Sequence, residues 1–300
     1  MIFLVSIISF GLLQIIPGDP VIQILGAHAT ATQQAALRQE LGLDKPVVIQ
    51  YLNWIGGIFH GNFGRSLVYH ESVGTLLKTR FPITACLSII SLVLSTIIGI
   101  VAGVISAVKR GTVIDSIISL LANTFVAIPT FWLGIVGIYL FGLKLGWLPI
   151  EGWTSPFTNL GKSLSQMVMP IIAMTIPSIA VIVRQTRSSM LETIRQDYVR
   201  TATSKGLRQR IVLYKHALRN ALIPVVTLVG MALAFLLAGE VMVETVFNIP
   251  GIGRLLIRAA LEKDYLIVQA GVLAIGTSVC LANLLVDIAY GWIDPRIRYK

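Results

Sequence analysis

The stretch ITACLSIISLVLSTIIGIVAGVISAV, residues 83–108, contains no charged side chain, and its length decides the environment of the chain. An α-helix rises about 1.5 Å per residue, so about 20 apolar residues cross the hydrocarbon layer of a bilayer. The composition agrees, because 55% of the 300 residues are hydrophobic and only 13% are charged. Soluble domains carry roughly a quarter charged residues. The sequence therefore predicts an all-α integral membrane protein.

Further apolar runs are separated by proline, glycine and charged residues, which predicts six transmembrane helices in all. The other five runs are residues 1–16, 114–143, 167–183, 221–243 and 266–292. The first lacks the cationic start and cleavage site of a signal peptide, so we expect a first transmembrane helix that is short or lacks its beginning. Proline inside a span indicates a kinked helix that faces protein or a cavity, which we expect at Pro129, Pro170 and Pro177.

The orientation of the helices follows from Lys and Arg in the short loops, which favour the cytoplasmic side. Residues 184–220 hold nine Lys or Arg against two acidic residues, and residues 109–110 and the tail 294–300 add more. These regions fall on one side of a six-helix protein. The sequence therefore predicts that they are cytoplasmic, and the net charge of +10 needs no nucleic-acid partner.

A polar segment, residues 17–81, separates the first two apolar runs, and its acidic and basic side chains nearly balance. Helix formers at residues 31–42 and a second start after Pro46 predict two short helices. The expected division is a first transmembrane helix at 1–16, an extracytoplasmic segment at 17–81 and a transmembrane domain at 82–300.

A basic amphipathic stretch, YVRTATSKGLRQRIVLYKHALRNALIP, occupies residues 198–224 inside the cytoplasmic loop of about residues 184–220. Gly206 predicts a turn between a helix that ends near Ser204 and another that starts near Arg208. Apolar residues spaced by four and three are predicted to lie on one helix face: Leu207, Ile211, Tyr214, Leu218 and Ala221. On physical grounds the stretch either lies on anionic lipid or docks on a cytosolic partner.

Eight short motifs occur in order between the apolar runs. They are PGDP (17–20), LGLDKP (41–46), GNFGRS (61–66), IPTFWLGI (128–135), DYVRTATSKGL (197–207), HALRNALIPVVT (216–227), NIPGIGRLL (248–256) and DPRIRYK (294–300). With these motifs the chain resembles permease subunits of bacterial ABC importers, in the branch that carries dipeptides, oligopeptides and nickel. The general importer signature begins Glu-Ala-Ala, and of it only Ala202 and Gly206 match here.

The resemblance implies a multi-pass protein of the bacterial inner membrane that forms a translocation path for small peptides. It implies a second, homologous permease chain, two ATPase subunits and an extracytoplasmic binding protein as partners. ATP and Mg²⁺ would bind the ATPases, with no cofactor, metal or catalytic residue on this chain. The only partial match to the phosphate-binding motif GxxxxGK[ST] is at residues 161–163, and it has Pro156 in place of the first glycine.

The resemblance also implies site residues. A coupling loop that docks on an ATPase would contain Asp197, Tyr198, Arg200, Ala202, Gly206, Leu207, Arg208 and Arg210. Docking of the binding protein is expected at Pro250, Gly251 and Gly253. Small and polar residues of the spans that could line the path are Thr124, Pro129, Thr130, Gly134, Ser178, Gly230 and Asn283.

Two other functions stay open at this point. A nickel or nickel-chelate importer shares these motifs, although His28, His60 and His70 are scattered and read as surface residues. A stand-alone secondary transporter or channel is disfavoured, because proton coupling needs charged groups in mid-membrane. The acidic residues within the spans, Glu240, Glu244 and Asp287, fall near helix ends instead.

Overall fold

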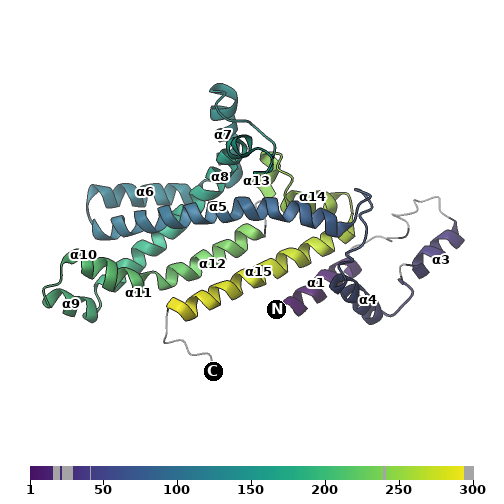
Figure 1. Cartoon of the computed structure of the whole chain (residues 1–300), viewed down its shortest axis with the longest axis horizontal. Helices are drawn as coiled ribbons and strands as arrows, with labels where there is room; N and C mark the ends of the chain where they lie inside the picture. The colour runs from purple at the N-terminus through teal and green to yellow at the C-terminus, as the bar shows by residue number, and fades with distance from the viewer. Residues whose placement is uncertain (16–20, 22–29, 41, 239–240, 294–300) are drawn as a thin grey trace. The chain divides into compact units, whose positions relative to one another are not determined.

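The computed structural model describes residues 1–15, 21, 30–40, 42–238 and 241–293, and Figure 1 shows that they are nearly all helical. The isolated bridge between Arg65 and Ser72 is the β-pairing found among these residues. The chain divides into two compact units, residues 1–82 with 255–277 and residues 83–254 with 278–300. The predicted all-α class is confirmed.

The first unit contains α1 (Ile2–Ile15), α3 (Ala31–Glu40) and α4 (Val47–Phe59), together with the first part of α15 (Tyr265–Ile293). Both short helices predicted between the first two apolar runs are present as α3 and α4. Pro46 precedes the first residue of α4, a position where a fixed φ and a missing N–H suit a helix start. Helix α4 packs against α1.

The second unit is built around α8 (Leu160–Ile194), against which α6 (Val113–Ala127), α7 (Thr130–Gly137), α12 (Ile223–Leu237) and α13 (Val241–Val246) all pack. Helix α5 (Val73–Val108) and α6 form a hairpin and lie side by side in Figure 1. A π-helix, η1 (Ile138–Lys144), continues α7. The core contains Leu87, Met167, Met174, Leu236 and Phe247.

Three helices in the described part of the chain are long and apolar enough to cross a membrane singly: α5, α8 and Tyr265–Val286 of α15. The number rises to five if each of two bent pairs crosses as one span, namely Val113–Ala127 with Thr130–Lys144 and Gln209–Ala221 with Ile223–Leu237. The short α1 is apolar as well. A multi-pass protein is therefore confirmed, and the count of six stays a prediction.

The proline positions have different outcomes. The chain bends by 96° between α6 and α7, where Ile128 is extended (φ −88°, ψ 123°). Proline pushes the preceding residue out of the helical region, so Pro129 accounts for this break. Helix α8 by contrast runs on through Pro170 and Pro177 as one helix. The run 114–143, expected to be one span, is thus two helices at a sharp angle.

Candidate coupling and translocation sites

The coupling segment, which we define as residues 197–221, contains α9 (Asp197–Ser204), α10 (Gln209–Ile211), a π-helix η2 (Val212–Leu218) and α11 (Arg219–Ala221). Gly206 lies between α9 and α10 with φ +76°, a backbone conformation that a residue with a Cβ rarely adopts. Helix α9 ends at Ser204, and Arg208 immediately precedes α10. The predicted helix–turn–helix is therefore confirmed in position and in the role of its glycine.

The apolar face predicted for this segment is only partly buried. Val199, Ala202, Val212, Ala217 and Ala221 pack into a cluster together with residues of α5 and α8: Val104, Ala107 and Met190. Of the five residues predicted to share one face, Ala221 is buried and Leu218 is half-buried, whereas Leu207, Ile211 and Tyr214 are exposed. The reason is η2, whose wider turn makes residues five apart share a face, so Val212 and Ala217 are buried together.

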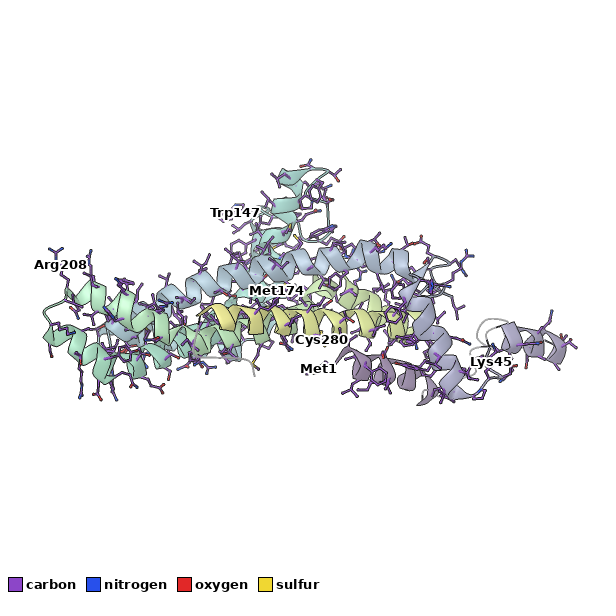
Figure 2. All side chains as sticks on the ribbon, turned by 60° about the horizontal axis from the view of Figure 1, so that its bottom comes forward. Met1, Lys45, Trp147, Met174, Arg208 and Cys280 are labelled. Carbon is purple, nitrogen blue, oxygen red and sulfur yellow. The ribbon has the colours of Figure 1, made fainter. Side chains whose placement is uncertain are left out.

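The outer surface of the segment is basic with an apolar edge. Among the predicted coupling residues, Arg200, Arg208 and Arg210 are exposed, and Figure 2 shows Arg208 projecting from the segment. The hydroxyl of Tyr198 accepts a hydrogen bond from Asn220 Nδ2 at 2.8 Å, which ties α9 to α11. Asp197 is also exposed, and its 4.0 Å pair with Arg200 is a weak surface contact. Of the predicted set, Ala202 is the buried member.

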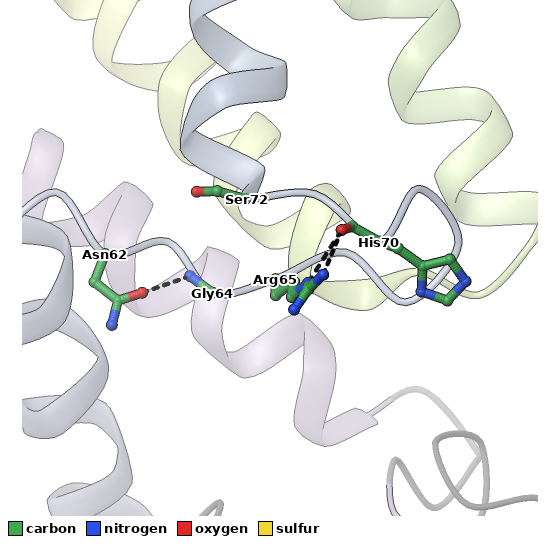
Figure 3. A pocket seen from close by; sticks show the side chains of 5 residues that line it. All are labelled: Asn62, Gly64, Arg65, His70 and Ser72. Carbon is green, nitrogen blue, oxygen red and sulfur yellow. Dashed lines mark hydrogen bonds between the residues drawn. The ribbon is translucent and has the colours of Figure 1, made fainter.

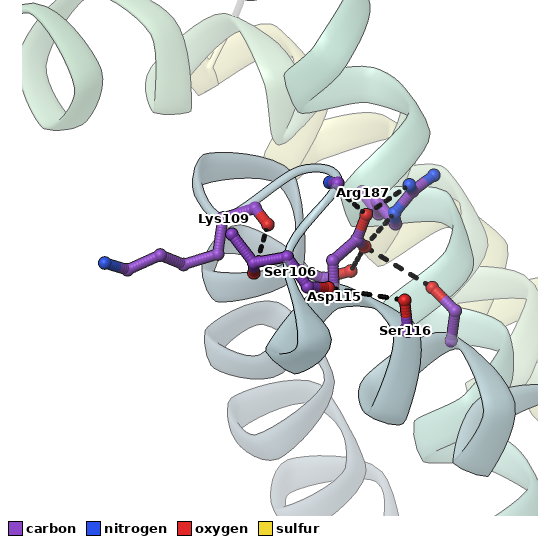
Figure 4. A network of polar contacts seen from close by, with 8 residues as sticks. Ser106, Lys109, Asp115, Ser116 and Arg187 are labelled. Carbon is purple, nitrogen blue, oxygen red and sulfur yellow. Dashed lines mark hydrogen bonds and ion pairs between the residues drawn. The ribbon is translucent and has the colours of Figure 1, made fainter.

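A buried ion pair joins the α5–α6 hairpin to α8, the helix that leads into the coupling segment (Figure 4). Asp115 in the first turn of α6 accepts from Arg187 of α8 through Nε at 2.8 Å and Nη2 at 2.9 Å. Ser106 Oγ of α5 donates to the same carboxylate at 2.5 Å, and the Gly111 N–H donates at 3.0 Å. Asp115 is 6% exposed, so this arrangement joins the end of α5, the start of α6 and the side of α8 around one charge.

The sequence reasoning missed Asp115 and Arg187. A lone acid in the first turn of an apolar run, just after the KRG turn, was the available signal. Its partner lies 72 residues away along the chain, and no pattern of sequence spacing predicts a pair so far apart.

The residues expected to line a translocation path are divided by the structure. A Cβ on Gly134 would lie 3.0 Å from the Phe247 ring, and a Cβ on Gly230 would collide with Val286. These two glycines allow close helix packing, and their place on the path stays a prediction. The hydroxyls of Thr124 and Ser178 donate to carbonyls of their own helices at 2.9 and 3.3 Å.

The other three path candidates are placed without being tested. Pro129 directly precedes α7, Thr130 is its first residue, and Asn283 lies exposed on α15. Thr124, Pro129, Thr130, Ser178 and Asn283 remain predictions as path residues.

The expected docking motif NIPGIGRLL instead surrounds a buried carboxylate. Glu244 of α13 is 2% exposed; it accepts from Thr84 Oγ1 of α5 at 2.5 Å and from the Arg254 N–H at 2.8 Å. The glycines of the motif are buried, and a Cβ on Gly251 would collide with the carboxylate. Gly251 and Gly253 therefore make room for Glu244, and Pro250 is half-buried. Docking of the binding protein at these three residues stays a prediction.

The motif GNFGRS opens a small pocket of about 440 Å³ in the first unit, lined by Asn62, Gly64, Arg65, His70 and Ser72 (Figure 3). Arg65 donates to the His70 carbonyl through Nε and Nη2 at 3.0 and 2.9 Å. The fully buried Asp264 fixes this loop, because its carboxylate accepts a hydrogen bond from Ser66 Oγ at 2.5 Å. His60 and His70 are exposed as expected.

Several predicted features lie outside the described residues. They are His28, Glu240, the side chain of Asp287 and the motifs at residues 17–20 and 294–300.

Comparisons with known proteins give the family. Residues 99–299 match the model for the binding-protein-dependent transport system inner membrane component, and residues 1–88 match its N-terminal model. The chain belongs to this family. It is thus a transport subunit that works with other subunits, and a multi-pass protein of the bacterial inner membrane.

Individual relatives are similar over almost the whole length. A probable peptide ABC transporter permease of Sinorhizobium fredii is 40% identical over 99% of this chain and 95% of its own. The dipeptide transport system permease protein DppB of Escherichia coli is 40% identical over 99% of this chain and 94% of its own. An inward-facing structure of the MetNI methionine ABC transporter matches with a TM-score of 0.59 at 19% identity, covering 73% of this chain and 96% of that one. This last likeness supports the fold alone.

Proposed function

We propose that this chain is one of two different permease subunits of an ATP-driven importer of small peptides. The family assignment supports import by a system that depends on a binding protein. Peptides are proposed as the cargo because relatives similar over nearly the full length are named for peptides or dipeptides. The nickel alternative is not favoured by those names.

The observation that carries the mechanism is the outer surface of the coupling segment. Leu207, Ile211 and Tyr214 are left exposed while the opposite face is packed on α5 and α8. An apolar edge bordered by Arg208 and Arg210 suits a groove on a soluble subunit, since apolar anchors ringed by charge are typical of protein interfaces. We assign this edge to an ATPase subunit and place the segment on the cytoplasmic side.

In this proposal ATP and Mg²⁺ bind two separate ATPase subunits. Their closure on ATP would favour one arrangement of the two permeases and their opening another, because each state makes different contacts with the coupling segments. Movement of α9 would reach the spans through the cluster that it shares with α5 and α8. An external binding protein would deliver the peptide, and the segment at residues 17–81 is its proposed contact.

The decisive experiment uses the whole complex, reconstituted in proteoliposomes with its ATPases and its binding protein. We expect ATP-dependent uptake of a labelled dipeptide, with ATP hydrolysis stimulated by the loaded binding protein. Uptake of Ni²⁺ but of no peptide would overturn the cargo, and uptake without ATPase subunits would overturn the class of transporter.

A variant in the turn tests the coupling segment itself. Gly206→Pro replaces a φ of +76° with one near −65°. The turn would then change, and α9 and α10 could no longer keep their relative orientation. We expect normal insertion with ATP hydrolysis uncoupled from uptake. Wild-type uptake by this variant would refute the assignment of the segment.

A further inference from the structure

Helix α1 carries its apolar side chains outward and its hydroxyls inward. Phe3, Leu4 and Ile8 are exposed, whereas Ser6 and Ser9 are buried. Ser6 Oγ shares a 2.7 Å hydrogen bond with the Tyr51 hydroxyl, and Ser9 Oγ donates to the Gln269 carbonyl at 2.7 Å. This polarity is the reverse of a helix in water. In an inner membrane protein, the outward face of α1 is therefore covered by lipid.

Helix α4 lies directly beside this lipid-covered helix. Tyr51 and Trp54 of α4 contact the Phe10 ring of α1, with centroids 5.5 and 5.7 Å apart. The sequence of α4, VVIQYLNWIGGIF, contains no charged residue, and none of its residues is fully buried. The segment at 17–81, expected to be polar, thus contains an apolar helix that the protein only half covers.

The uncovered part of α4 is a continuous apolar stripe. Val48, Leu52, Ile55 and Phe59 recur at steps of four, three and four, which places them along one face of a helix. Val48 is 69% exposed, Leu52 58% and Phe59 85%. The polar residue Asn53 lies exposed on a different side of the helix from the stripe, whereas Gln50 lies toward α1 and accepts from Gln14 Nε2 at 3.5 Å.

We propose that α4 is embedded in the bilayer and that acyl chains cover the stripe of Val48, Leu52, Ile55 and Phe59. Lipid is the occupant that the contacts favour, because α4 continues the surface of α1 that already faces lipid. Tyr51 and Trp54, each with a polar edge on an apolar ring, are typical of the membrane interface. The 13 residues of α4 span only about 20 Å, so the helix enters one leaflet and does not cross the layer of roughly 30 Å.

An embedded α4 would fix the distance between the membrane surface and the loop that follows the helix. Helix α4 ends at Phe59, and the pocket residues Asn62, Gly64 and Arg65 begin three residues later. A lipid-anchored α4 holds this loop close to the membrane surface. The proposal concerns the membrane alone and holds whichever cargo is carried.

The test compares two sides of one helix in the assembled transporter in nanodiscs. Cys86 and Cys280 are first replaced by Ala, and nitroxide spin labels are placed singly at Val48, Leu52 and Phe59, with Asn53 as the matched exposed control. We expect oxygen, which partitions into lipid, to relax the three stripe labels. The water-soluble complex Ni-EDDA should not reach them and should leave their relaxation unchanged. The control is expected to show the opposite pattern.

Two outcomes would overturn the proposal. Relaxation of the stripe labels by Ni-EDDA would mean that the stripe faces water, and immobile labels protected from both reagents would mean that a protein subunit covers it. A second measurement needs no variant, since a bilayer-dissolved photoactivatable diazirine can be applied to the native chain. Modification at residues 48, 52, 55 and 59 without modification at 53 is the expected result, and an unmodified α4 beside a modified α1 would refute it.

Discussion

The ion pair between Asp115 and Arg187 gives a prediction whose size follows from the structure. Replacing Asp115 by Asn removes the charge that accepts both guanidinium donors of Arg187, at 2.8 and 2.9 Å. The new amide also presents its own N–H groups to the donors of Ser106 or Gly111, which now have a carboxylate oxygen at 2.5 and 3.0 Å. One substitution therefore leaves several donors without an acceptor.

The expected loss of stability is about 2–3 kcal/mol. Removing one partner of a fully buried pair costs about 3–5 kcal/mol. The side chain of Arg187 is 32% exposed, so it can regain hydration and the loss falls toward that of a hydrogen bond to a charged group, about 1.5–3 kcal/mol. Scaled to a large domain, this corresponds to a melting temperature lower by about 5–10 °C.

The assay is thermal unfolding of the purified transporter, followed by tryptophan fluorescence, together with peptide uptake in proteoliposomes. Ser116→Ala is the matched control, because Ser116 Oγ is exposed and donates only to the Thr112 carbonyl at 3.3 Å; its effect should stay within about 0.5 kcal/mol. Arg187→Lys should be intermediate, since an ammonium cannot make the two-pronged contact. A melting temperature for Asp115→Asn equal to that of the control would refute the reasoning.

Three further predictions concern the other sites. Reversing the charge at Arg208 and Arg210 should leave insertion and melting unchanged, because both are exposed, and should abolish stimulated ATP hydrolysis; intact stimulation would show that the ATPase docks elsewhere. Gly251→Ala should lower the yield of folded protein, since its Cβ would collide with the buried glutamate of α13, and a wild-type yield and melting curve would contradict that packing. A cysteine at Ser204 should react with an impermeant maleimide only from the cytoplasm and one at Asn62 only from outside, and the reverse labelling pattern would invert the proposed orientation.

The sequence could predict features that depend on composition or on neighbouring residues. The lack of charge at residues 83–108 gave the membrane class, and the single glycine at position 206 gave the turn between α9 and α10. Such features need only the local properties of a peptide chain. The break at Pro129 was expected as a kink, but its angle of 96° depends on how α7 packs against α8 and α13.

The features that could not be predicted depend on irregular helix geometry or on contacts between distant segments. The apolar face of the coupling segment was predicted with an ordinary helical period, and the π-helix η2 shifts that period by about one residue. Gly251 and Gly253 were assigned to docking from their motif alone, and nothing in their own stretch shows that the side chain of Glu244 lies against them. Glycine suits both roles, because it leaves space beside a buried carboxylate and it also suits a flexible exposed loop.

The carboxylate of Glu244 also has a consequence for biogenesis. Its acceptor sites are filled by Thr84, 160 residues earlier in the chain, and by a backbone N–H ten residues later. During synthesis the hydroxyl emerges 160 residues before the glutamate, so the contact can form only after the segments between them have been made. The contact of α5 and α13 with the N–H at the start of α14 (Ile252–Leu261) therefore exists only when all three segments are in place.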